Sequence, residues 1–169
     1  DPTTASSVGQ IYYNSTSNSF KYAAPGAAGT WSSGGNLNTA RSSSAGAGTQ
    51  TAGLVYGGKT NITNNELYNG SAWTEVGDLN AANMKSAGFG ISTAALNAGG
   101  GTPNKATTEI YNGTSWTEVN DLNQSRNGIT GFGTTTAGLV ASGAEPTPSA
   151  KTETWDGTSW TEVNDLNAT

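Results

Sequence analysis

The sequence predicts an all-β fold made of repeated units of four short antiparallel strands. Tryptophans recur at intervals of 42, 43 and 44 residues, at Trp31, Trp73, Trp116 and Trp160. An Asn-Gly or Asp-Gly pair, a strong hairpin signal, stands just before each of the last three. No helical period of 3.6 residues is sustained along the chain. Four-stranded units of this length are typical of β-propeller blades.

The second unit illustrates the expected order of strands. A strand of small residues spans 87–93, and three further strands follow at 94–100, 107–113 and 115–122. The pair Asn112-Gly113 between the last two strands suits the positive φ angles of a type I′ turn. The first strand of each unit consists mainly of Gly, Ala, Ser and Thr, which we expect to fit the crowded space near a propeller axis.

The recurring large apolar residues indicate packing between successive units. A leucine follows each tryptophan by six residues, and an aromatic residue precedes each of the last three tryptophans by five. Residues that return in step with the period are expected to fill the space between neighbouring sheets. The predicted core consists of Trp31, Trp73, Trp116, Trp160, Tyr68, Tyr111, Trp155, Leu79, Leu122 and Leu166.

The chain divides into a partial unit and three full ones. The predicted boundaries are 1–38 for an N-terminal hairpin and partial blade, then 39–80, 81–123 and 124–167 for three full blades. The strand candidates of the partial blade are 9–13, 19–23 and 29–33. We expect such an incomplete ring to belong to a longer array or to associate with copies of itself, because repeats leave faces that need covering. Closure as a minimal four-bladed propeller is the alternative.

Composition excludes several functional classes. The 169 residues carry a net charge of −5 and only 11% are charged, which disfavours nucleic acid, since phosphate binding needs a cationic surface. The chain has no Cys and no His, which excludes disulfides, thiol nucleophiles, Cys/His zinc sites and Ser-His-Asp triads. No apolar run reaches the roughly 20 residues of a membrane span. We therefore expect no nucleic acid partner, no membrane insertion and no cofactor.

Carboxylates recur in register in the third and fourth strands of each unit. Those of the third strand are Glu66, Glu109 and Glu153, and those of the fourth are Glu75, Glu118 and Glu162. A hydrolase could use a pair such as Glu109 and Glu118 as acid and base. Because the same pair recurs in every unit, we expect solvated outer-strand residues and no catalytic site. A calcium site is also not expected, because no Asp-x-Asp-x-Asp-Gly loop is present.

The loops between the second and third strands are the expected place for binding. They span 59–66, 101–109 and 144–153, and they differ in length and content while the flanking strands barely change. Divergent loops on a constant scaffold are typical of surface recognition, and neutral drift in tolerant loops is the alternative. The candidate binding residues are Lys59, Asn61, Asn64, Asn104, Lys105, Glu145 and Lys151.

Several short motifs are similar to those of kelch repeats. The shared pattern is a strand ending in a double glycine, then a tyrosine, then a tryptophan, as in "LVYGG" (54–58) and "ELYNGSAW" (66–73). The match covers residues 36–167, and its double glycine is reduced to Ser142-Gly143 in the third unit. A WD40 identity is disfavoured, because that repeat needs a Gly-His pair and the chain has no His.

The N-terminal segments narrow this resemblance. "GQIYYNSTSNSFKY" (9–22) and "GTWSSGGNLNTAR" (29–41), joined to the repeated units, resemble kelch-like repeat proteins of marine bacteriophages. The resemblance implies a non-enzymatic virion structural protein of the tail-fibre or appendage type, exposed on the virion surface. Its expected partners are a host-surface glycan or protein, or other virion proteins. The alternatives are a bacterial secreted or cell-surface carbohydrate-binding propeller, a propeller-type polysaccharide-active enzyme, and a natural or engineered repeat scaffold with no ligand.

Overall fold

The structure, a computed structural model, describes residues 11–14, 19–22 and 33–167. The chain forms two compact parts, an N-terminal part (1–33) and a C-terminal part (34–169). In the N-terminal part, β1 (Ile11–Asn14) and β2 (Ser19–Tyr22) pair as an antiparallel hairpin, close to the two strands predicted there. Trp31 and all but the last residue of the third predicted strand lie outside the described residues.

The prediction of an all-β chain is confirmed, because the described residues form strands and no helix. The C-terminal part contains three sheets of four antiparallel strands, which we call the first, second and third sheets. The first contains β3 (Ala45–Thr49), β4 (Ala52–Tyr56), β5 (Asn65–Tyr68) and β6 (Trp73–Val76). The second contains β7 (Ala87–Ile91), β8 (Ala94–Gly100), β9 (Lys105–Tyr111) and β10 (Trp116–Val119). The third contains β11 (Thr130–Thr134), β12 (Ala137–Ala141), β15 (Thr152–Trp155) and β16 (Trp160–Val163).

Each sheet is a meander, with strands paired in the order of the chain. In the third sheet a short hairpin, β13 (Ala144–Glu145) and β14 (Thr147–Pro148), is inserted between the second and third strands. Because the chain reverses direction at every strand, the loop between the second and third strands lies at the same end of the sheet as the segments that connect one sheet to the next. We call this end of the sheets the loop rim.

The turn between the third and fourth strands differs from the type I′ prediction. In the first sheet Tyr68 pairs with Trp73, so the loop has four residues rather than two. Gly70 has a φ of 92°, and the Asn69 side chain accepts hydrogen bonds from the N–H groups of Ser71 and Ala72 at 3.0 and 2.9 Å. The Asn side chain thus stabilises the loop by accepting these hydrogen bonds, and the Asn itself does not adopt a positive φ angle.

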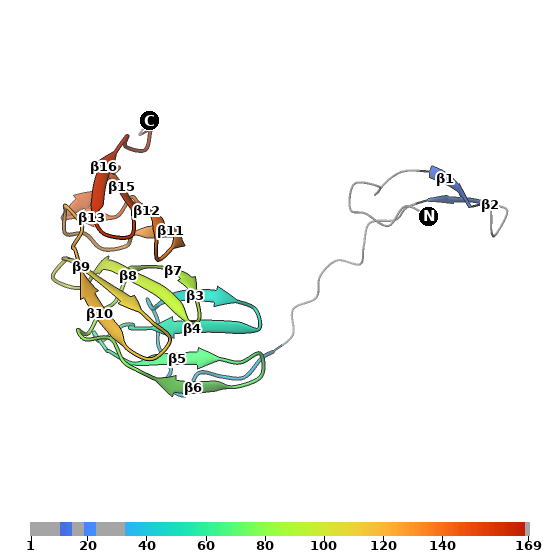
Figure 1. Ribbon diagram of the computed structural model, residues 1–169, viewed down its shortest axis with the longest axis horizontal. Helices are drawn as coiled ribbons and strands as arrows, with labels where there is room; N and C mark the ends of the chain where they lie inside the picture. The colour runs from blue at the N-terminus through green and yellow to red at the C-terminus, as the bar shows by residue number, and fades with distance from the viewer. Residues whose placement is uncertain (1–10, 15–18, 23–32, 168–169) are drawn as a thin grey trace. The chain divides into compact units, whose positions relative to one another are not determined.

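The three sheets follow one another within the C-terminal part, with their first strands β3, β7 and β11 side by side (Figure 1). Two hydrophobic clusters join them, one between the first and second sheets and one between the second and third. We call these contacts the first junction and the second junction. Small residues in β3, β7 and β11 permit this close approach, since a larger side chain would push neighbouring backbones apart.

A backbone ladder links the sheets at the residue pair before each first strand. Ser43, Lys85 and Gly128 occupy equivalent positions and have φ angles of 56°, 56° and 65°. The Lys85 N–H donates to the Ser43 carbonyl, and the Gly128 N–H donates to the Lys85 carbonyl, both at 2.8 Å. The same bond therefore joins each sheet to the next.

The predicted core residues fall into three groups. Those that are buried in the two junctions are Leu79, Tyr111, Trp116, Leu122, Trp155 and Trp160. Tyr68 and Trp73 are half-buried on the face of the first sheet that points away from the second. Leu166 departs from the expectation and is 49% exposed, because no sheet among the described residues covers the outer face of the third sheet.

Candidate functional site

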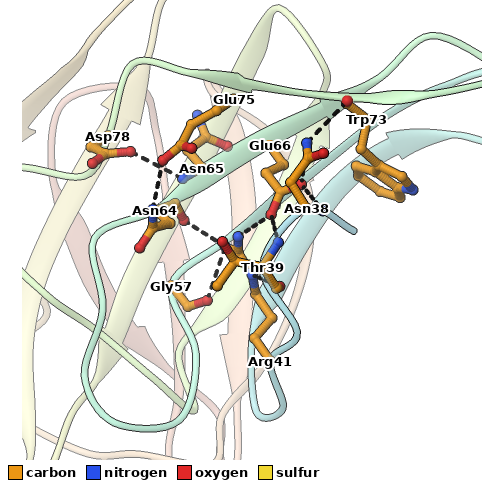
Figure 2. A network of polar contacts seen from close by, with 10 residues as sticks. All are labelled: Asn38, Thr39, Arg41, Gly57, Asn64, Asn65, Glu66, Trp73, Glu75 and Asp78. Carbon is orange, nitrogen blue, oxygen red and sulfur yellow. Dashed lines mark hydrogen bonds and ion pairs between the residues drawn. The ribbon is translucent and has the colours of Figure 1, made fainter. Parts of the chain in front are cut away.

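Near the loop rim, a glutamate in the third strand of each sheet binds the segment that leads into the first strand of that sheet. Glu66 accepts hydrogen bonds from the Asn38 backbone N–H at 2.7 Å, the Asn38 side-chain amide at 3.0 Å and the Thr39 N–H at 3.1 Å. The same Asn38 amide donates to the Trp73 carbonyl at 3.1 Å, and Arg41 forms an ion pair with Glu66 (Figure 2). We call this arrangement an Asn–Glu clamp.

The clamp is repeated in the second sheet without its arginine. Asn80 donates to Glu109 from its backbone and its side chain, at 2.8 and 2.9 Å, and also to the Trp116 carbonyl at 2.9 Å. Asn83 stands where Arg41 stands in the first clamp, and its side chain donates instead to the Gly99 carbonyl at 2.8 Å. The Glu109 carboxylate is therefore buried on neutral donors alone.

The third sheet restores the charged form of the clamp. Asn123 donates twice to Glu153 at 2.8 Å and once to the Trp160 carbonyl at 3.1 Å. Arg126 forms an ion pair with Glu153 at 2.9 Å, and both side chains are buried. Each clamp thus fastens the segment that leads into a sheet to the third strand of that sheet.

These contacts overturn half of the expectation for the carboxylates. Glu66, Glu109 and Glu153 are buried, so the prediction that they are solvated is wrong. Their direct cross-strand partners Glu75, Glu118 and Glu162 are exposed, as predicted. The difference arises because the segment that leads into each sheet binds the glutamate of the third strand. The Asn that follows Leu37, Leu79 and Leu122 was the sequence signal for this arrangement.

Electrostatics favour the charged form of Glu66. Burial by itself raises the pKa of its carboxyl, but the donors of Asn38 and Thr39 and the charge of Arg41 together outweigh burial and hold the pKa below its usual value. In the first junction, burial raises the pKa of the Tyr56 hydroxyl far above its usual range. That hydroxyl donates to the Leu96 carbonyl at 2.8 Å.

Four of the predicted binding residues on the loop rim hold neighbouring parts of the fold together. Asn64 donates to Glu75 at 2.6 Å, and the Lys105 amino group donates to the Ala82 carbonyl at 2.6 Å. Asn104 donates to the Ala144 carbonyl at 2.8 Å and accepts from Asn127 at 2.6 Å, which links the loops of the second and third sheets. Lys151 pairs with Glu162 at 2.5 Å on the surface.

The other three predicted binding residues lie on the same rim. Lys59 is exposed and borders a hollow of about 380 Å³ that is also lined by Ala40, Arg41, Ser42 and Thr60. Asn61 is half-buried with a φ of 59°, and its side-chain oxygen accepts no hydrogen bond from the described residues. Glu145 lies in β13, where its backbone pairs with Thr147.

Comparison with known proteins assigns no relative. No protein-family model matches the chain, and no curated protein sequence matches it. Within the described residues, no group of three His, Cys, Asp or Glu side chains is placed to hold a metal ion. The same part of the chain contains no helix that is long and apolar enough to cross a membrane.

Proposed function

We propose that this chain is a non-enzymatic, kelch-like β-propeller module of a phage virion appendage, acting in adhesion to a host surface or in virion assembly. The observation that carries the proposal is a constant scaffold beneath a variable rim. The Asn–Glu clamps and the backbone ladder repeat from sheet to sheet, while the loops above them differ in length and sequence.

The propeller part of the proposal is supported by how the sheets succeed one another. Three four-stranded meanders with adjacent first strands, joined by the same ladder bond, are what neighbouring blades around an axis require. The kelch-like part is supported by the double-glycine position, where both residues have positive φ in every sheet. These residues are Gly57, Gly58, Gly99, Gly100, Ser142 and Gly143.

The non-enzymatic part is supported by the state of the carboxylates. Glu109, the buried member of the pair that could serve a hydrolase, has its oxygens engaged by Asn80 and Ala81. A general acid or base must reach the substrate proton it transfers, whereas this carboxylate holds backbone of its own chain. On this proposal the chain acts at the virion surface, and its partner is a host glycan or protein, or another virion protein.

The test is an exchange of loop-rim residues that carry no clamp contact. Replacing 59–62 and 146–148 with Gly-Ser sequence of equal length should reduce binding to host cells or to a glycan array at least about tenfold, as for loss of a hot spot. The matched control is a Gly-Ser replacement of Gln50 and Thr51, which are exposed in the β3–β4 turn at the end of the sheet opposite to the loop rim. Unchanged binding by the rim variant would exclude adhesion through these loops and leave the assembly role.

A further inference from the structure

The outer face of the third sheet carries large apolar side chains in the open. Phe132 is 59% exposed, and it lines a hollow of about 480 Å³ together with Leu139, Gly138 and Trp155. The equivalent residue of the second sheet, Phe89, is 5% exposed because the third sheet covers it. The third sheet therefore presents the face that the second sheet buries.

Phe89 shows what such a face needs in order to be covered. Its ring lies over two glycines of the third sheet, so close that a Cβ added at Gly131 or Gly138 would stand 2.7 or 2.6 Å from a ring carbon. Real Cβ atoms do not approach so closely, and the site is therefore specific for a sheet with glycine at both positions.

The first junction uses a different pair of residues for a different aromatic side chain. Tyr56 of the first sheet lies over Gly88, where an added Cβ would stand 2.5 Å from its hydroxyl. The second position, which is glycine in the third sheet, is here Ala95, fully buried in the same cluster. A Gly–Ala pair thus receives Tyr56, and a Gly–Gly pair receives Phe89.

The first sheet also carries a Gly–Gly pair, and within 33–167 no other sheet covers it. Gly46 and Gly53 stand at the positions of Gly131 and Gly138. The nearest atoms to a Cβ added at either one belong to the first sheet itself, with Leu54 O at 3.1 Å from Gly46 and Thr49 O at 3.5 Å from Gly53. No ring from another described sheet lies over them.

We propose that the chain associates head to tail with a second copy of itself, with Phe132 of one copy packed onto Gly46 and Gly53 of the other. The contact would continue the second junction with the same residue types on both sides. Because the two surfaces differ, the contact is heterologous and generates a ring or an open filament. The inference does not depend on the proposed function, since it rests on the two end sheets alone.

The third strand of the first sheet limits how far the contact can extend, because its clamp is already occupied. Asn38 already holds Glu66, which is the clamp that Asn167 of an incoming copy would otherwise occupy. The new junction therefore joins β11 and β12 of one copy to β3 and β4 of the other, and leaves Leu166 and Asn167 outside.

Sedimentation of the full chain over a wide concentration range tests the proposal. The wild type should form dimers or larger species, and Phe132→Asp and Gly53→Leu should each weaken association at least about tenfold. Each variant keeps one intact surface, so an equimolar mixture of the two should form a heterodimer. Gly53→Ala adds only a Cβ that the sheet accommodates, and it should weaken association while leaving the thermal unfolding midpoint of the dilute, monomeric chain unchanged.

Three results would overturn the proposal. A wild-type chain that stays monomeric at every concentration would leave the two faces to other segments of the same chain. Loss of association in Phe132→Asp but not in Gly53→Leu would mean that two third sheets pair face to face. Weakening by Leu166→Ser would place the contact on the outer strands. Ile91→Asp is the matched control, because Ile91 is 55% exposed but lies outside both surfaces.

Discussion

The first and second junctions join similar sheets by different choices of side chain. In the first junction the large residue is Tyr56, at the end of β4, and it pairs with Ala45 of β3, while Ala47 of β3 pairs with Leu54. In the second, Phe89 stands at the position of Ala47, and Ala98 replaces Tyr56. The preceding sheet therefore contributes one aromatic ring to each junction, from β4 in the first and from β7 in the second, and the small residues of the following sheet differ accordingly.

The polar contacts of the two junctions differ as well. The clamp of the first junction lacks an arginine, whereas Arg126 completes that of the second. The Trp160 indole N–H donates to the Thr108 hydroxyl at 3.0 Å, but its counterpart on Trp116 has no partner among the described residues. The second junction thus holds an ion pair, although Nε and Nη1 of Arg126 have no partner among the described residues, whereas the first junction has no ion pair at its clamp and leaves the Trp116 indole N–H without a partner.

The largest difference between the junctions should appear when the clamp glutamates are neutralised. Glu153→Gln leaves the buried Arg126 without its counter-charge, and we expect a loss of about 3–5 kcal/mol in the free energy of unfolding. Glu109→Gln strands no cation, so its cost should be about 1–3 kcal/mol. Urea denaturation of both variants measures the difference. Equal losses would mean that the arginine contributes nothing to the second junction.

An intermediate effect is expected from adding one methyl group at the glycine that receives Phe89. Gly138→Ala forces the ring of Phe89 to move and should cost about 1–3 kcal/mol by overpacking. Gly53→Ala, at the equivalent position of the open face, should change stability by less than about 0.5 kcal/mol. Thermal unfolding of the pair checks this, and a tolerated Gly138→Ala would show that the ring has room to shift.

The smallest effect should come from the hydroxyl that distinguishes the first junction. Tyr56→Phe removes the hydrogen bond to the buried Leu96 carbonyl and should cost about 1 kcal/mol. Burial raises the folded-state pKa of Tyr56 above the unfolded value of about 10. This tyrosine therefore stabilises the fold fully below pH 10, and that contribution is lost as the pH rises further.

The comparison between wild type and Tyr56→Phe should consequently change with pH. The difference in unfolding free energy is expected to narrow above about pH 10, where the wild type loses stability that the phenylalanine variant never had. Denaturation curves collected from neutral to alkaline pH provide the measurement. A difference that stays constant to high pH would contradict the assigned role of the hydroxyl.

The sequence allowed the sheets and much of their packing to be predicted because these depend on local and periodic signals. The spacing of Trp73, Trp116 and Trp160 and the turn pairs before them locate the starts of the fourth strands, although the strand predicted at 115–122 ends earlier, at Val119. The clamps were not predicted, because Glu66 is buried by Asn38, which lies 28 residues away in the chain. Composition alone gives no reason to pair a strand carboxylate with so distant an amide.

The candidate loop residues show the same limit. Asn104 was expected to face a ligand because it stands in a variable loop, yet its amide joins the loops of two neighbouring sheets. Whether a polar side chain in a loop meets solvent or another loop depends on how units stack, and that information is spread over two units. The open face at Phe132 escaped prediction for a similar reason, since its meaning comes only from comparison with the buried Phe89.

The arrangement of rings and glycines also restricts the order in which such units can succeed one another. A unit that ends its second strand in tyrosine must be followed by one with glycine at the position of Gly88, where an added Cβ would stand 2.5 Å from the Tyr56 hydroxyl. The third unit carries both Phe132 and the Gly131–Gly138 pair, so a duplicate of it could follow itself without any compensating substitution. Gene duplication that lengthens this array would be least disruptive when the third unit is the one copied.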